Sequence, residues 1–376
     1  MMSSYFDFFC KNIESEGAQN PDRITGTCYS MCPEEEVKLR EVEHLVHVLE
    51  VWGSDRKLVK SYSRSAAASN MAVPHLLRPY SVLTNTVQYL LLDITRRTDV
   101  PTFVMYDYVN DRLRAVRQEA TIQRLPPEEC ACLLEPMIRF YVYYGYKLSN
   151  LHIKDYDPVL NKKYLLECIK WYLSCRDTIA KARGKIDHLT GFLSNLDLND
   201  KAKKNKLVND QVLVESLFIL CNLDDLNPLY RYVNLSKELK RDTRIQIAYK
   251  IAIANLQGNY IRVCRLSDML CPLSYCALFT YLPTLQRRAL KVMSHAYNNN
   301  RLTVPSATLA QWLCFGTDRD AALACAHYGL TVEGAAVRFD KTKFKADAAL
   351  NTPKPQAIRE KFDLSIMDIF TYTTPK

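Results

Sequence analysis

Residues 301–340 carry the most informative pattern of structural elements in the chain, and they read RLTVPSATLAQWLCFGTDRDAALACAHYGLTVEGAAVRFD. Residues 301–304 predict a short extended piece. Ser306 can then cap a helix over residues 307–315, because its hydroxyl can accept a hydrogen bond from the first helical turn. Gly316 ends that helix, since glycine readily adopts the left-handed conformation found at helix ends. The start of the stretch therefore predicts a strand followed by a helix.

The second half of the stretch predicts another helix and a hairpin. Thr317 or Asp318 caps this helix, and Gly329 ends it. Residues 330–340 alternate on either side of a glycine-containing turn, which predicts a small β-hairpin. With a helix expected over residues 285–297, the order helix, strand, helix, helix, hairpin is typical of a winged-helix domain. A helical cap with a stray hairpin is the alternative interpretation.

The chain before this stretch is rich in helical patterns. Apolar residues recur at three- and four-residue steps, as at Leu165, Cys168 and Tyr172, which places them on one face of a helix. Helices are expected at residues 78–97, 101–123, 127–149, 158–183, 208–223, 228–240, 243–257 and 272–298. We therefore predict a mainly α fold, in which a stack of helical hairpins precedes the C-terminal winged helix.

An earlier helix is expected to begin near Pro33. Proline suits the first helical position, and the carboxylates of residues 34–36 suit the positive end of the helix dipole. The apolar residues expected on the buried face of this helix are Leu39, Val42, Val46 and Leu49.

These patterns divide the chain into four expected parts. They are a flexible lead-in at residues 1–25, a helical scaffold at 26–284, a winged helix at 285–350 and a tail at 351–376. Within the scaffold, a polar stretch at residues 199–209 predicts an exposed loop. This loop contains Lys203, Lys204 and Lys206, which resemble a short nuclear-import signal, with an ordinary basic loop as the alternative.

Composition and missing motifs disfavour most enzyme classes. The chain has 376 residues, of which 48% are hydrophobic and 24% charged, as expected of a globular protein. Its 10 glycines are few, and they form neither a G-x-G nor a P-loop pattern, so the common nucleotide-binding turns are absent. The H-E-x-x-H and G-x-S-x-G motifs are absent too. Nothing singles out a cysteine–histidine nucleophile, so we expect no catalytic residue and no cofactor.

The cysteines raise the alternative of a zinc site. Cys28, Cys32, His44 and His47 come close to a zinc-finger pattern, but the two histidines are too closely spaced. The helix expected at Pro33 also leaves no room for the strand hairpin of a finger. We therefore expect no metal, and thiols that pack as small apolar side chains. An odd count of 13 cysteines in a long chain without a signal-peptide or membrane-spanning pattern predicts an intracellular protein with free thiols.

Charge is unevenly distributed along the chain. The net charge is +9, although residues 1–50 hold four basic and ten acidic residues. The basic remainder favours a nucleic acid or an acidic partner, with a solvated surface as the alternative. The residues expected to bind RNA or DNA are Arg301, Arg319, Arg338, Lys341, Lys343 and Lys345. If the last hairpin strand continues, alternation places these three lysines on one side; their alternative role is to keep an edge strand from aggregating.

The hairpin is also the expected site of protein binding, because a free strand edge can pair with another chain. The residues assigned to this contact are Leu330, Val332, Val337 and Phe339.

A separate basic cluster, Arg112, Arg114 and Arg117, lies on a predicted helix among carboxylates. Asp111 precedes Arg114 by three residues, so the two can pair along the helix. We expect a scaffold network of salt bridges here, with an RNA-facing stripe as the alternative.

Four blocks of sequence resemble the GANP-type domain, also called the Sac-three homology domain. Residues 26–34, GTCYSMCPE, are similar to its G-x-C-x-x-M-C-P-E opening, and residues 60–67, KSYSRSAA, to its basic R-S-A-A segment. Residues 77–90 resemble its L-R-P…V-L…T-x-x-Y-L block, and residues 106–119 its D-R-x-R-x-(V/I)-R-x-(D/E) helix. The residues that carry the resemblance are Gly26, Cys28, Met31, Cys32, Pro33, Glu34, Arg40, Arg64, Arg78, Pro79, Arg112, Arg114 and Arg117.

The resemblance implies a PCI- or TPR-like scaffold that ends in a winged helix. Large members of the family hold together the nuclear mRNA-export complex TREX-two. There they pair with a second PCI-domain protein, which a small acidic protein clasps, and the combined surface binds nucleic acid. The resemblance therefore implies a non-catalytic adaptor of the nucleus and cytoplasm with these partners and no membrane.

The family also contains short, domain-only members. The phenylalanine–glycine repeats and the centrin-binding helix of the large members have no counterpart in this sequence, so we expect a short member. Such members are linked to centrosome duplication, spindle assembly and mitotic progression. Regulation of these processes, through centrosomal or spindle proteins, is the alternative function.

Overall fold

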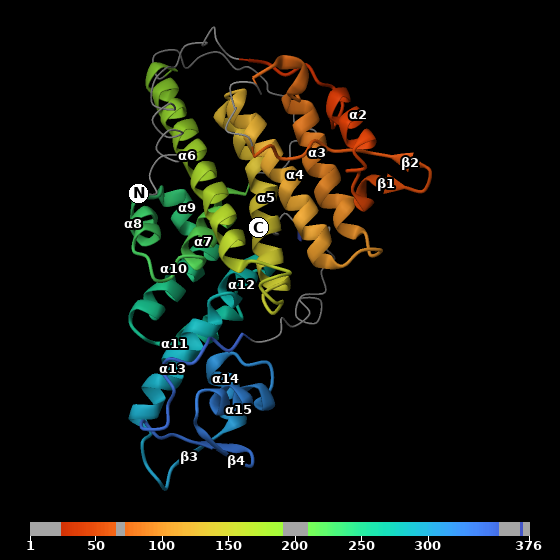
Figure 1. The fold of residues 1–376 in the computed structure, drawn as a ribbon. Helices are drawn as coiled ribbons and strands as arrows, with labels where there is room; N and C mark the ends of the chain where they lie inside the picture. The colour runs from red at the N-terminus through yellow and green to blue at the C-terminus, as the bar shows by residue number, and fades with distance from the viewer. Residues whose placement is uncertain (1–23, 65–71, 191–209, 353–368, 371–376) are drawn as a thin grey trace. The chain divides into compact units, whose positions relative to one another are not determined.

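The computed structural model describes residues 24–64, 72–190, 210–352 and 369–370 (Figure 1). These residues are mainly helical, which confirms the mainly α part of the predicted fold class. The chain forms two compact units, Met1–Phe140 with Leu165–Asn209, and Tyr141–Tyr164 with Asp210–Lys376. Most of the expected lead-in and tail, and the lysines of the 199–209 loop, lie outside the described residues. Within the described part of the chain, no helix is long and apolar enough to cross a membrane.

The first unit is built mainly from helices. Its elements are α2 (Glu34–Val42), η1 (Val48–Glu50), β1 (Val51–Trp52), β2 (Asp55–Arg56), η3 (Pro74–Leu76), α3 (Tyr80–Leu92), η4 (Ile94–Arg96) and α4 (Thr102–Ile122), with parts of α5 (Pro127–Lys147) and α6 (Pro158–Thr190). Helices α3 and α4 pack against each other and run side by side in Figure 1. Four of these helices were predicted close to where they lie, because their apolar spacing is regular.

Helix α2 departs from the prediction in length and in orientation. It begins after Pro33 as expected but ends at Val42, and His44 then adopts a left-handed conformation with φ 54°. Leu39 and Val42, expected on the buried face, are exposed, whereas Arg40 is buried. The predicted orientation is wrong because Arg40 has a buried carboxylate partner, described below, and that pair turns the polar side of the helix inward.

The second unit contains a run of shorter helices. They are α7 (Gln211–Leu220), α8 (Asn227–Asn234), α9 (Lys237–Arg241), α10 (Thr243–Leu256), α11 (Tyr260–Ser267), α12 (Pro272–Phe279) and α13 (Leu282–Ala296). The helix predicted at 228–240 is interrupted because Leu235 is extended and Ser236 caps α9. The helix predicted at 272–298 is likewise divided, and α11 was not predicted.

The C-terminal elements of this unit occur in the predicted order. They are β3 (Thr303–Pro305), α14 (Ser306–Leu313), α15 (Asp318–His327), β4 (Thr331–Glu333) and β5 (Ala336–Arg338). The strands form an antiparallel sheet in the order β3-β5-β4. Thr317 caps α15 by accepting a hydrogen bond from the backbone N–H of Asp320. Helix α14 ends at Leu313, because the next residue, Cys314, is left-handed with φ 54°, so the predicted end at Gly316 is wrong.

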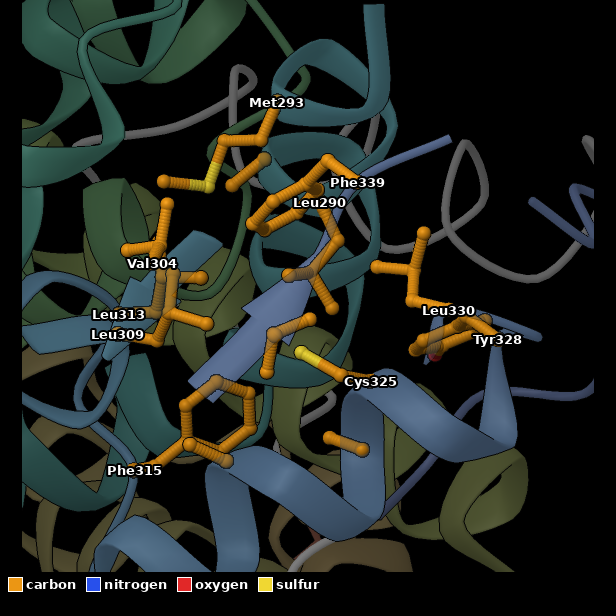
Figure 2. Packing of buried hydrophobic residues seen from close by; sticks show 14 residues of the cluster. Leu290, Met293, Val304, Leu309, Leu313, Phe315, Cys325, Tyr328, Leu330 and Phe339 are labelled. Atoms are coloured by element: carbon orange, nitrogen blue, oxygen red, sulfur yellow. The ribbon is translucent and has the colours of Figure 1, made fainter. Parts of the chain in front are cut away.

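One hydrophobic cluster holds these elements together (Figure 2). Its buried members come from α13, α14, α15, β3, β5 and the segments next to them; examples are Leu290, Leu309, Cys325 and Phe339. Burying an aromatic or aliphatic side chain contributes about 1.5–3 kcal/mol, so this cluster supplies the main stabilisation of the small sheet. The predicted boundary between residues 284 and 285 falls inside α13, so a domain formed by these elements has to begin with that helix.

Candidate functional site

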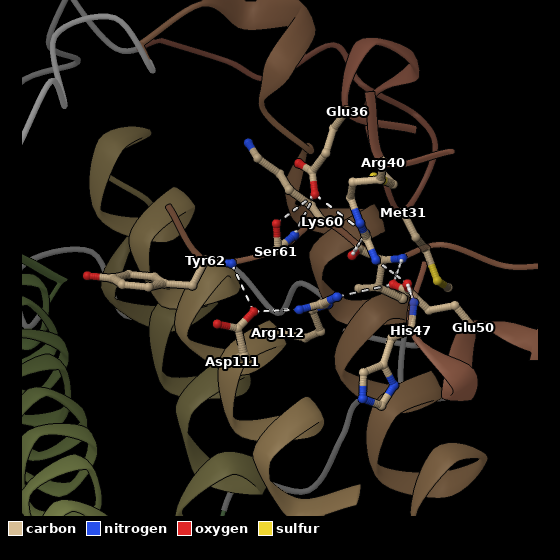
Figure 3. A network of polar contacts seen from close by, with 12 residues as sticks. Met31, Glu36, Arg40, His47, Glu50, Lys60, Ser61, Tyr62, Asp111 and Arg112 are labelled. Carbon is tan, nitrogen blue, oxygen red and sulfur yellow. Dashed lines mark hydrogen bonds and ion pairs between the residues drawn. The ribbon is translucent and has the colours of Figure 1, made fainter. Parts of the chain in front are cut away.

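The signature residues of the N-terminal segment gather around two buried carboxylates. The first is Glu50, at the end of η1, whose side chain is fully buried (Figure 3). Its carboxylate pairs with Arg40 of α2 and with Arg112 of α4, the latter at 3.3 Å. Two elements far apart in sequence are therefore joined through one carboxylate.

Neutral donors complete the coordination of Glu50. Its Oε1 accepts hydrogen bonds from the Tyr108 hydroxyl at 3.2 Å and from the Val59 backbone N–H at 3.1 Å. Its Oε2 accepts one from the His47 backbone N–H at 3.0 Å. Burial alone would raise the pKa of Glu50, but Arg112, the Val59 N–H and Arg40 together hold that pKa below its usual value. Glu50 is thus ionised at neutral pH, and the network around it carries charge.

The second buried carboxylate is Glu119 of α4. Arg78 donates to it through Nη2 at 2.7 Å, through Nε at 3.0 Å and through its backbone N–H at 2.7 Å. Lys60 lies 3.3 Å from the same carboxylate, and Arg78 also donates to the Met31 carbonyl at 3.1 Å. Glu119 therefore fixes the signature segment and the start of α3 to the last turn of α4.

Gly26 is required at the point where the signature segment meets residue 77. A Cβ at this position would lie 2.3 Å from the Leu77 carbonyl oxygen, far inside van der Waals contact. The Gly26 N–H donates to Gln123 Oε1 at 2.9 Å, and the Cys28 N–H donates to the Leu77 carbonyl at 2.9 Å. The glycine thus permits a close backbone approach that hydrogen bonds then hold.

The two signature cysteines are buried thiols. Cys28 and Cys32 are both in the core, and burial, with Glu36 nearby, raises the pKa of Cys32 to about 12, so this thiol is protonated at neutral pH. His47 is occupied elsewhere, because its ring stacks on Tyr108 and its Nδ1 accepts a hydrogen bond from the Leu49 N–H. The described residues contain no cluster of His, Cys, Asp or Glu that could hold a metal ion. Their cysteines are free thiols.

Most of the remaining signature residues make contacts within the fold or lie at helix starts. Arg117 lies 3.3 Å from Glu167, and Arg114 stacks over the ring of Tyr62 at 3.8 Å. Pro33 and Pro79 precede α2 and α3, whereas Glu34 and Arg64 are exposed. The helix that carries Arg112, Arg114 and Arg117 therefore uses these side chains in ion pairs and stacking, which supports the scaffold interpretation over an RNA-facing stripe.

The six basic residues assigned to nucleic acid have different surroundings. Arg338 is half-buried and pairs with Glu333 at 2.7 Å, and Arg319 lies between two carboxylates at residues 318 and 320. Arg301, Lys341, Lys343 and Lys345 are exposed, and no ion pair between described residues engages them. Glu333 therefore offsets the charge of Arg338. Arg319 is exposed and, like the last four residues, has no ion-pair partner among the described residues.

The three lysines do not lie on a strand. β5 ends at Arg338, and residues 341–343 form a turn, so the predicted alternation along a continued strand is wrong. Backbone contacts position the segment instead. The Lys341 N–H lies 3.4 Å from Asn298 Oδ1, in the turn that leads to Arg301, and the Lys345 N–H donates to the Tyr328 carbonyl at 2.8 Å. The strand could not continue because these contacts direct the chain back over α15.

Sequence reasoning missed one basic residue beside this segment. Arg287 of α13 donates to the Ala348 carbonyl at 3.5 Å, so its guanidinium lies next to the chain that follows Lys345. Its position in an apolar helical pattern gave no signal of this contact. We define the C-terminal basic surface as Arg287, Arg301, Lys341, Lys343 and Lys345.

The residues assigned to protein binding are core residues. Leu330, Val337 and Phe339 are buried in the hydrophobic cluster, and Val332 packs against it from a half-buried position. Leu330, Val337 and Phe339 therefore leave almost no side-chain surface for a partner, because the inner face of the small sheet needs them, and the contact through Val332 stays a prediction. Strand β4 is still an outer strand of the sheet, so one edge of its backbone remains outside the pairing with β5.

The sequence of the chain is similar to those of several known proteins. The family model of the SAC3/GANP family matches residues 31–334. The sequence is 27% identical to Protein xmas of Drosophila melanogaster over 327 residues, which cover 82% of this chain and 15% of that protein. It is 24% identical to SAC3 family protein B of Arabidopsis thaliana over 322 residues, 79% of this chain and 17% of that protein. It is 25% identical to SAC3 family protein 1 of Schizosaccharomyces pombe over 375 residues, 92% of this chain and 34% of that protein. The chain thus spans about a third or less of the length of these relatives.

Proposed function

The chain belongs to the SAC3/GANP family, and from this premise we propose that it is a non-catalytic scaffold that joins a partner protein and RNA in an mRNA-export assembly. The family is a scaffold family with a general role in mRNA export. The chain spans only part of the length of its relatives, so any activity that it shares with those whole proteins is proposed here. An export role would place the protein in the nucleus and the cytoplasm.

The observation that carries the proposal is the C-terminal basic surface on a small helix-and-sheet unit. The element order from α13 to β5, and a three-stranded antiparallel sheet in the order β3-β5-β4, support a winged helix. Arg301 and three lysines at its surface carry charge that no described carboxylate offsets by pairing. Lysines and arginines in this arrangement contact phosphates, which gives affinity without base specificity.

Salt dependence tests the RNA contact. If Lys341, Lys343 and Lys345 each neutralise one phosphate of a single strand, their triple alanine variant should lower the log–log salt slope of binding by about 2, at about 0.7 per contact. Labelled single-stranded RNA is titrated at several salt concentrations. A control variant with alanine at the exposed Lys163, Lys237 and Lys250 has the same net charge. Equal slopes in the two variants would refute the assignment of RNA binding to this surface.

The outer edge of β4 is the proposed contact with a PCI-domain partner, itself clasped by a small acidic protein. The edge of a strand presents backbone N–H and C=O groups that can pair with another chain. This pairing does not require the side chains of the small sheet, which are needed in the core. Hydrogen–deuterium exchange with the purified partner complex tests this contact. Residues 331–333 should become protected on binding, and unchanged exchange of β4 in a complex that does form would contradict it.

A further inference from the structure

Five exposed apolar side chains follow one another along a short segment of the first unit, at residues that the signature network does not use. They are Leu39 and Val42 on α2, Leu45 and Val48 after it, and Trp52 on β1, which we call the N-terminal apolar surface. Their exposed fractions are 59% for Leu39, 73% for Val42, 62% for Leu45, 51% for Val48 and 44% for Trp52. Single exposed apolar side chains are ordinary, but five within fourteen residues are not.

This surface cannot turn inward, because the opposite side of the segment is fixed by charge. Arg40 is buried against Glu50, and Glu36 accepts hydrogen bonds from the Ser61 N–H at 2.8 Å and from the Ser61 hydroxyl at 2.9 Å (Figure 3). The Leu45 N–H donates to the Arg40 carbonyl at 2.8 Å, which holds the turn after α2. Rotating Leu39 and Val42 toward the core would expose the ion pair and leave two charges without partners, so the outward orientation is the stable one.

Trp52, the last of these five residues in the sequence, is held in place by two contacts. Its indole N–H donates to the Tyr89 hydroxyl at 3.1 Å, and the Arg97 guanidinium lies over its ring at 4.8 Å. Binding at a surface that is already ordered costs little conformational entropy, so even a modest contact area yields measurable affinity.

The charge around this surface identifies the chemistry of its partner. Among residues 34–57, five acidic and three basic side chains are exposed, although the chain as a whole has a net charge of +9. Glu34, Glu35, Glu41 and Glu43 are exposed. Of these, Glu41 lies 3.2 Å from Arg56 and Glu35 lies 3.6 Å from His75, so Glu34 and Glu43 have no ion-pair partner among the described residues. Carboxylates beside an apolar surface repel nucleic acid and anionic lipid headgroups and attract Lys and Arg.

We propose that the N-terminal apolar surface binds a protein segment that presents apolar side chains flanked by Lys or Arg, such as a basic amphipathic helix. The surface belongs to the first unit and the C-terminal basic surface to the second, so this inference does not depend on the RNA-binding proposal. The scaffold would then hold two partners of opposite charge on different units.

A pair of model peptides tests the proposal on the full chain. The probe is a fluorescein-labelled amphipathic helix with a leucine face and lysines elsewhere, and its match replaces every lysine with glutamate. The lysine peptide should bind, and its affinity should fall as the salt concentration rises. The glutamate peptide should not bind. Val42→Ser with Leu45→Ser should weaken binding about tenfold or more, which corresponds to about 1.4 kcal/mol. Glu34→Gln with Glu43→Gln should weaken it as well, while leaving the apolar side chains in place.

The matched control removes two equally exposed apolar side chains from another helix. Tyr230 and Val233 on α8 are 74% and 61% exposed, so Tyr230→Ser with Val233→Ser should leave peptide binding unchanged. The proposal would be overturned if the two peptides bound with equal affinity. It would also be overturned if the Tyr230/Val233 variant lost as much affinity for the lysine peptide as the Val42/Leu45 variant. A photo-cross-linker at position 42 identifies the occupant directly. Cross-links to the lysine peptide support the proposal, whereas cross-links only to a second copy or to another part of the same chain overturn it.

Discussion

Removing the charge of Glu50 is the most direct test of the signature network. Glu50→Gln keeps the size of the side chain but replaces one oxygen with an NH2 donor. Arg40 and Arg112, both buried, would then face a neutral amide. The Tyr108 hydroxyl and the Val59 and His47 N–H groups would compete for a single remaining acceptor oxygen. A glutamine cannot satisfy these donors, because its amide nitrogen accepts none of them.

The expected cost follows from the burial of the pair. Breaking a buried ion pair by removing one partner lowers the free energy of unfolding by about 3–5 kcal/mol. At roughly 2–4 °C per kcal/mol for a domain of this size, the melting temperature should fall by roughly 6–20 °C. The control is Glu41→Gln, which breaks the exposed pair with Arg56 and should cost about 0–1 kcal/mol. Thermal denaturation followed by circular dichroism measures both.

The pH dependence provides a second readout of the same group. The pKa of Glu50 is lower in the folded chain than its usual value near 4.3, so its ionisation stabilises the fold above about pH 4.3. This stabilisation is lost as the pH falls through the lower folded-state pKa. The difference in stability between the wild type and Glu50→Gln should therefore shrink on acidification. The role given to Glu50 would be refuted if the free energy of unfolding of Glu50→Gln lay within about 1 kcal/mol of the wild-type value at pH 7 and this difference did not change with pH.

Other positions offer independent tests of the signature segment. Gly26→Ala should destabilise the chain by about 1–3 kcal/mol, since its Cβ would lie 2.3 Å from the Leu77 carbonyl oxygen; an unchanged denaturant midpoint would contradict the close approach. Cys28→Ala with Cys32→Ala should cost about 1–3 kcal/mol through lost packing, and chelators should leave the wild-type melting temperature unchanged. Stoichiometric zinc in protein purified without added metal would contradict this. Cys32 should react slowly with a thiol reagent at pH 8, because burial raises its pKa to about 12; labelling as fast as that of an unfolded control would show that the thiol is exposed.

The sequence determined the features that depend on neighbouring residues. Helix periodicity placed most of the long helices, and Thr317 and Gly329 marked the two ends of α15. Pro33 marked the start of α2. Caps, prolines and glycines act within a few residues along the chain, so they can be recognised without knowledge of the fold.

Only the tertiary structure decided which side of each element is buried. The spacing of Leu39 and Val42 predicted a buried face, but the partner of Arg40 is Glu50, and that carboxylate also binds Arg112, sixty-two residues farther along the chain. Glu50 cannot be recognised from the sequence, because one glutamate in a short 3-10 turn has no local signature. Burial of a charge is stable only when its partner is buried with it, and such partners are set by packing between distant segments. The same reason applies to Val337 and Phe339, since whether a hairpin face meets a core or a partner depends on the helices that cover it.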